Sequence, residues 1–154
     1  MNGFIRLFRY CFFLPIAILA GWGTNYLLIE ASRFLLPTLD ISWSFLLARE
    51  IDYPLIGSFI RHIPMYAMFI GSSVIGGLAY GFAAIYAAPN VNKVIIYILI
   101  ISAVLGSLSS LITAFYILEW DKFHFYFSNI LGLIAFMVFS IISIFIAIEK
   151  KSKT

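Results

Sequence analysis

The sequence predicts an all-α integral membrane protein, a four-helix bundle with a short amphipathic helix in its first extracytoplasmic loop. Four apolar runs contain no charged residue, and each is long enough to cross a hydrocarbon core of about 30 Å as an α-helix. These runs are Tyr10–Ile29, Ile63–Ala88, Val94–Leu118 and Phe125–Ile148. The composition, 63% apolar and 11% charged, lies far outside the range of soluble domains. We therefore expect residues 1–154 to form a single membrane domain.

The first run is interpreted as an uncleaved signal anchor. Arg6 and Arg9 precede it, as basic residues precede the apolar part of a secretory signal peptide. A cut after Ala20 would place Ile18 where a signal peptidase needs a small residue, and the apolar run continues to Ile29. We expect the run to stay in the protein as its first span.

A long outer loop, Glu30–His62, follows the first span. Pro37 is expected to break the chain, and Asp40 is suited to cap a short helix over Ile41–Glu50. Ile41, Phe45 and Leu46 fall within one broad face of that helix. Such a helix lies flat at the lipid–water boundary or covers the end of the bundle.

The other connections are short. Residues 89–93, which contain proline and asparagine, separate the second and third spans, and residues 119–124 separate the third and fourth. Short connections make consecutive helices antiparallel neighbours. The last three spans are therefore predicted to form an up-down-up unit, with the first span more loosely tethered.

The distribution of basic residues predicts the orientation. Six of the ten Lys and Arg residues lie on one side: Arg6, Arg9, Lys93, Lys150, Lys151 and Lys153. The other four are Arg33, Arg49, Arg61 and Lys122. The excess predicts that both termini are cytoplasmic, in the inner or plasma membrane of the cell. Basic residues this sparse and this close to membrane helices indicate contact with lipid headgroups, not nucleic acid.

Small residues at four-residue spacing are the clearest pattern within the spans. The predicted helix-packing residues are Ser73, Gly77 and Gly81 in the second span, and Ser102, Gly106, Ser110 and Ala114 in the third. In lipid, close backbone approach over small side chains is a main source of helix association. The two rows either face each other or face another subunit. Replacing either Gly77 or Gly106 with leucine is expected to separate helices.

Aromatic and carboxamide residues gather toward the outer ends of the spans. Trp22, Trp43 and Trp120 all fall on the outer half, as in an aromatic belt at the membrane interface. Asn25 and Asn129 lie near the same level. Their amides need hydrogen-bond partners, for which packing between helices is favoured over transport.

Chemistry-bearing residues are sparse. No span contains His, Asp, Glu or Lys, so no serine within a span has a base beside it. The histidines, His62 and His124, lie at outer helix ends, and Glu119 and Asp121 near His124 do not form a strong metal pattern. We predict no catalytic residues, no cofactor and no metal site. The single cysteine, Cys11, excludes an intrachain disulfide.

The predicted function is therefore association within the membrane. We expect a small non-enzymatic protein that acts as a subunit, accessory or effector component of a membrane complex, with other membrane subunits or itself as partner. The alternative is a homo-oligomeric pore or channel lined by Ser, Thr and Asn. A pore needs an aligned polar face along a whole span, and the serines of the third span do not form a continuous one.

Overall fold

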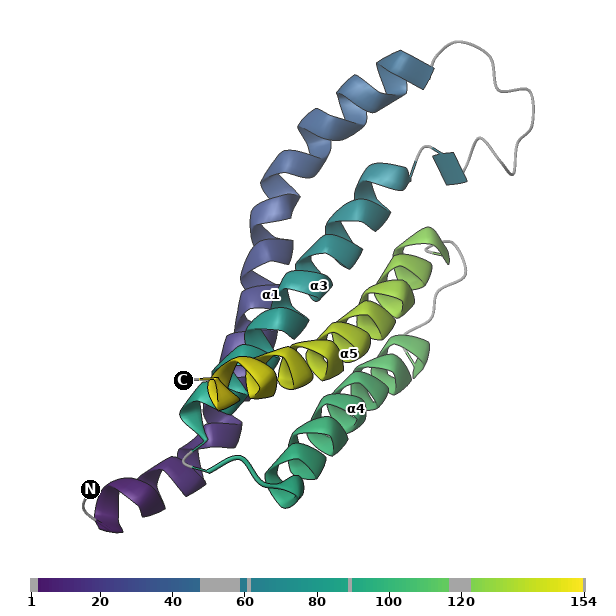
Figure 1. Cartoon of the computed structure of the whole chain (residues 1–154). Coiled ribbons are helices and arrows are strands. Elements are labelled where there is room, and N and C mark those ends of the chain that lie inside the picture. The colour runs from purple at the N-terminus through teal and green to yellow at the C-terminus, as the bar shows by residue number, and fades with distance from the viewer. Residues whose placement is uncertain (1–2, 48–58, 61, 89, 117–122, 154) are drawn as a thin grey trace.

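The computed structural model describes residues 3–47, 59–60, 62–88, 90–116 and 123–153, and long helices make up nearly all of them. The helices are α1 (Gly3–Leu47), α3 (Ile63–Ala87), α4 (Lys93–Tyr116) and α5 (Phe123–Ser152) (Figure 1). Each contains a stretch long and apolar enough to cross a membrane. Those stretches are Phe8–Ala31, Ile63–Ala87, Lys93–Ile112 and Tyr126–Ser152. The all-helical class and the four candidate spans are thus confirmed.

The prediction of a separate loop helix is wrong for the residues that the structure describes. Residues 41–47 are helical, but they continue α1, and both Pro37 and Asp40 lie inside that helix. Residues 48–50 lie outside the described ranges. A proline removes one helical hydrogen bond and bends the helix, but it does not have to end it. α1 consequently runs well past its apolar stretch, and its end extends beyond the start of α3 (Figure 1).

The start of α4 and the end of α3 have identifiable caps. Asn92 accepts the backbone N–H of Ile95 through Oδ1 at 2.9 Å, which is the usual bond of an asparagine N-cap. At the end of α3, Lys151 Nζ donates to the carbonyl oxygens of Ile85 (2.8 Å) and Ala88 (3.0 Å). A guanidinium nitrogen of Arg9 lies 3.4 Å from the Tyr86 carbonyl oxygen. Cations from α1 and α5 therefore satisfy the last carbonyls of α3, where the helix dipole is negative.

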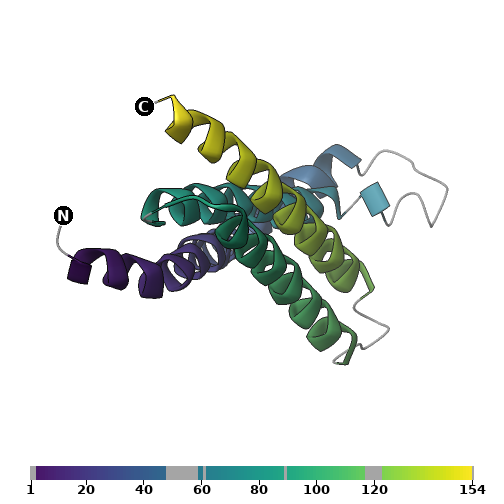
Figure 2. The same cartoon turned by 60° about the horizontal axis from the view of Figure 1, so that its bottom comes forward.

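The helices are ordered in space as α1, α3, α5 and α4. The most extensive contacts join α3 to α5 and α1 to α3, and α4 packs mainly on α5. Figure 2 shows the pair α1 and α3 crossing the pair α5 and α4 at an angle. The prediction that the second and third spans pack as neighbours is wrong for the described residues, because α4 packs mainly on α5. The long buried side chain of Tyr80 supplies the hydrogen bonds between α3 and α4.

The apolar core draws residues from all four helices. Its buried members are Phe13, Ala17, Tyr80, Ala84, Ile85, Ala88, Ile95, Leu99, Ala103, Phe136, Ile144 and Ala147. Most of them lie between the middle of the helices and the end that carries both termini (Figure 1). Many large apolar side chains elsewhere are exposed, as expected for surfaces that face lipid. Few members of this core lie toward the other end of the molecule.

Candidate functional site

The row of small residues on α3 lies against α5. A Cβ atom on Gly77 would lie 2.7 Å from the Phe136 carbonyl oxygen and 3.0 Å from the Ser140 amide nitrogen. A Cβ on Gly81 would lie 2.7 Å from the Ile144 amide nitrogen and in direct collision with the Ser143 hydroxyl. These neighbours are mostly backbone atoms, so α3 and α5 approach each other over the two glycines.

A hydrogen bond between side chain and backbone joins the same two helices. The hydroxyl of Ser143 donates to the Gly77 carbonyl oxygen at 3.0 Å and also lies 2.9 Å from the Ser140 carbonyl oxygen. Nearer the start of α3, a Cβ on Gly132 of α5 would lie 2.9 Å from the Ser73 hydroxyl. The close contact therefore extends from Ser73 to Gly81 along one side of α3.

An adjacent side of α3 approaches α1 in the same manner. A Cβ on Gly76 would lie 2.8 Å from both the Asn25 Cβ and the Gly21 carbonyl oxygen. A Cβ on Gly21 would lie 2.6 Å from the Tyr80 Cβ. The Ser73 hydroxyl lies 3.4 Å from Asn25 Oδ1, across the same interface. Small residues thus let α3 sit between α1 and α5.

The row of small residues on α4 does not pack on α3, which differs from the expectation that the two rows face each other. Gly106 faces α1, because its Cβ would lie 3.1 Å from the tip of the Trp22 ring. Ser110 lines a cavity next to Trp22, and Ser102 contacts the Tyr80 hydroxyl at 2.5 Å. The side-chain environment of Ala114 lies outside what the structure describes. For Gly106, the nearest atoms outside its own helix belong to the Trp22 side chain.

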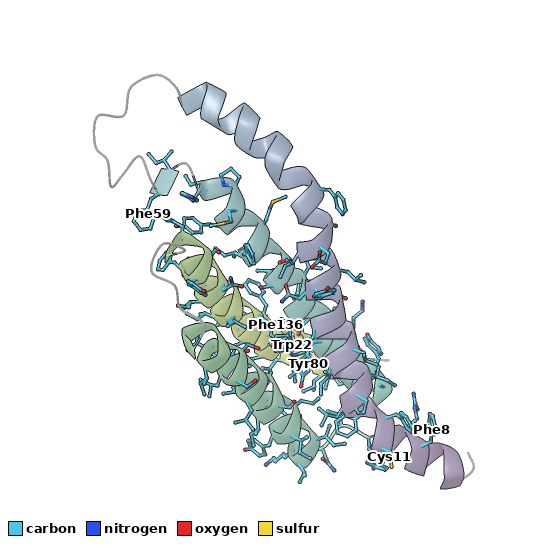
Figure 3. All side chains as sticks on the ribbon, turned by 180° about the vertical axis from the view of Figure 1, so that it is seen from behind. Phe8, Cys11, Trp22, Phe59, Tyr80 and Phe136 are labelled. Atoms are coloured by element: carbon cyan, nitrogen blue, oxygen red, sulfur yellow. The ribbon has the colours of Figure 1, made fainter. Side chains whose placement is uncertain are left out.

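Trp22 of α1 contacts both α5 and α4. Its ring lies against Phe136 of α5, with centroids 4.8 Å apart, and it reaches Gly106 of α4. Figure 3 shows Trp22 with Tyr80 and Phe136 between α1 and α4. The sequence places Trp22 in an interfacial aromatic belt, whereas in the structure its ring fills space between helices.

A mostly apolar cavity with a few polar side chains opens beside Trp22, and we call it the α1–α4 groove. It has a volume of about 230 Å³. Its lining residues are Trp22, Asn25, Tyr26, Ile29, Ser110, Asn129 and Leu133. The sequence predicts that Asn25 and Asn129 both lie toward the outer ends of their helices, and the structure brings them to one cavity. The groove offers carboxamide and hydroxyl groups at the depth of the apolar spans.

A second cluster lies where α3 and α5 begin. The rings of His62 and His124 are stacked with centroids 4.1 Å apart and planes 7° from parallel. The Tyr66 hydroxyl shares a hydrogen bond of 2.5 Å with Nδ1 of His124. Phe59 packs edge-on against His124 at 5.1 Å. We call these residues the histidine cluster.

The surroundings of His124 in the histidine cluster lower its pKa. Burial lowers the pKa of His124 below its ordinary value, and the neighbouring His62 lowers this pKa further. A histidine with a depressed pKa in the folded state contributes stability that is fully present above the unfolded pKa of about 6.5. That stability is lost as the pH falls through the lower folded-state pKa, because the unfolded chain binds the proton more readily.

We therefore predict that acidification from about pH 7.5 to about pH 5.5 lowers the thermal midpoint of the detergent-solubilised protein. His124→Phe keeps an aromatic ring in the cluster but cannot bind a proton, so this variant should lose most of that pH dependence. The measurement is the unfolding temperature of both proteins across the pH range. An unchanged pH dependence in His124→Phe would contradict the assignment.

Within the described part of the chain, no group of three or more His, Cys, Asp or Glu residues lies close enough to hold a metal ion. Glu119 and Asp121, which are close to His124 in the sequence, lie outside the described residues. The pairing of Tyr66 with His124 was missed, because only the folded helices bring the end of α3 beside the start of α5.

Comparison with protein-family models, curated proteins and solved structures found no match for this chain. The proposals that follow therefore depend on the residues and contacts described above.

Proposed function

We propose that this chain is a small non-enzymatic subunit or accessory component of a membrane complex, and that it associates through the α1–α4 groove. The occupant that best fits is a transmembrane helix of another subunit. The observation that supports this is that Ser110, a member of the small-residue row on α4, lines the groove together with Asn25 and Asn129. Helices in lipid gain most from backbone approach over such rows.

The polar residues in the lining of the groove support the same proposal. A carboxamide at membrane depth needs hydrogen-bond partners, since lipid tails offer none. Asn25 has the Ser73 hydroxyl nearby, and Ser110 donates to the Gly106 carbonyl oxygen at 3.1 Å. Asn25 and Ser110 place a carboxamide and a hydroxyl in the lining of the groove. A helix that brings a polar side chain to the groove would gain about 0.6–2 kcal/mol per hydrogen bond.

The pore alternative receives less support from the described serines. Ser102 points to Tyr80, Ser107 is buried, and Ser109 is exposed on the surface. A lumen needs these hydroxyls on one continuous face. We further propose that both termini are cytoplasmic in the inner or plasma membrane, as the excess of basic residues on that side indicates.

Photo-crosslinking in the native membrane tests the association. We expect p-benzoylphenylalanine in place of Tyr26, an exposed residue of the groove, to give a discrete adduct with one integral membrane protein. The same residue in place of Phe145, which is exposed on α5 away from the groove, should give no such adduct. Mass spectrometry identifies the captured span. An adduct of two copies of this chain would make the complex a homo-oligomer.

Two serine variants provide the matched control. Ser110→Leu fills the groove and should abolish the adduct, whereas Ser109→Leu places the same side chain on the exposed neighbour and should leave it. Both variants are compared with the parent by thermal stability in detergent. Equal adducts from the Tyr26 and Phe145 positions, together with a monomer after mild detergent extraction, would contradict the proposal.

A further inference from the structure

A cavity separate from the α1–α4 groove lies at the end of the molecule that carries both termini. Its volume is about 600 Å³, and it is bounded by the turn between α3 and α4, the first turn of α4 and the last turns of α5. Figure 1 shows that this turn and the two termini lie toward the same end. The cavity therefore lies at the ends of two candidate membrane spans.

Two lysines from different helices line this cavity. Lys93 is exposed at the start of α4, and Lys151 comes from the end of α5. The bonds from Lys151 Nζ to the carbonyl oxygens of Ile85 and Ala88 fix the position of its charge. The nearby carboxylate of Glu149 does not line the cavity and is paired with Lys153 at 2.5 Å. The lining is therefore cationic.

Uncharged hydrogen-bond donors surround the same space. Asn90, Asn92 and Ser152 all line it. Because Oδ1 of Asn92 accepts the Ile95 N–H, the remaining polar group of that side chain is the NH₂ donor. The positive end of the α4 dipole also lies at this position. Lysine charge, amide and hydroxyl donors and a helix start form a combination that suits a phosphate group.

The rest of the lining is apolar. Val91, Ile96 and Ile148 form this part, and the last two belong to membrane-spanning stretches. A free phosphate ion gains nothing from such a surface, whereas the glycerol and first acyl carbons of a lipid do. We propose that this cavity binds the phosphate headgroup of an anionic phospholipid, with Lys93 and Lys151 on the phosphate and the isoleucines on the acyl chains.

Native mass spectrometry of the full-length protein in mild detergent tests this proposal. We expect the parent protein to retain phosphatidylglycerol in preference to phosphatidylcholine at equal lipid concentration. Lys93→Gln should lower phosphatidylglycerol retention about fivefold, the effect of removing one basic residue at an anionic lipid surface. Asn90→Asp, which adds a carboxylate to the lining, should lower it as well.

Lys150→Gln is the matched control, because it removes the same charge from an exposed residue that does not line the cavity. It should retain phosphatidylglycerol like the parent. Equal losses in Lys93→Gln and Lys150→Gln would overturn the proposal in favour of diffuse attraction. Displacement of the lipid by millimolar inorganic phosphate would overturn the lipid identity, and so would equal retention of the two lipids by the parent.

Discussion

Gly77→Leu should be among the most destabilising single substitutions in this chain, lowering the free energy of unfolding by about 1–3 kcal/mol or more. The first added carbon already meets the Phe136 carbonyl oxygen at 2.7 Å and the Ser140 amide nitrogen at 3.0 Å. These are backbone atoms of α5 and cannot rotate away as a side chain can. The substitution must therefore move α5 as a whole, and it also disturbs the bond from Ser143 to the Gly77 carbonyl oxygen.

Gly71→Leu is the control for this prediction. Gly71 lies on the same helix, and nothing lies within 4 Å of a Cβ placed there. Thermal unfolding in detergent, with oligomer size measured alongside, should show a large loss for Gly77→Leu and little change for Gly71→Leu. If the two variants melted alike, the close contact between α3 and α5 would not be a source of stability.

The positions of the spans could be predicted from sequence because lipid imposes a simple rule. An uncharged apolar run of about 20 residues has few alternatives to a membrane-spanning helix. The end of the first helix could not be predicted from the same signals. Pro37 and Asp40 are typical of a break and a new cap, yet the helix continues through both to Leu47. A proline costs one hydrogen bond, and the other bonds of a long helix can maintain it through the bend.

Which helix packs on each row of small residues could not be predicted from the spacing of those residues. Four-residue spacing places Gly77 and Gly81 on one face, but it does not say which helix covers that face. Consecutive order in the chain favours α4, whereas the structure has α5 there. For Gly106 the occupant is a side chain, Trp22, and not a helix backbone. These contacts depend on the shape complementarity of helices that are distant in the sequence.

The candidate site, too, could be predicted only in part from the sequence. The sequence indicates that Asn25 and Asn129 lie at similar depth and that both histidines lie at outer helix ends. It does not indicate that the carboxamides share one groove or that the imidazole rings stack. The depth of a residue is set by its position along its helix. The contacts between the carboxamides and between the imidazole rings depend instead on the rotation of each helix about its own axis. The burial of Tyr80 and its hydrogen bonds to α4 could not be predicted for the same reason.

Tyr80→Ala should have the largest effect of all, a loss of about 3–5 kcal/mol in the free energy of unfolding, as for other buried aromatic truncations. The side chain of Tyr80 is 1% exposed. Its hydroxyl donates to the Leu99 carbonyl oxygen at 2.9 Å and lies 2.5 Å from the Ser102 hydroxyl, which joins α3 to α4. Its ring lies 6.1 Å from that of Phe136 on α5.

Tyr80→Phe separates the two contributions, because it keeps the ring and removes only the hydroxyl. We expect it to cost about 0.6–2 kcal/mol, the range for a hydrogen bond between membrane helices. Ser102→Ala should cost less in the Tyr80→Phe background than in the parent, since the partner hydroxyl is already gone. Thermal unfolding of the four proteins in one detergent measures this coupling. Additive losses would mean that the two hydroxyls do not interact, and α4 would then be held to α3 by the Tyr80 ring and the surrounding apolar contacts alone.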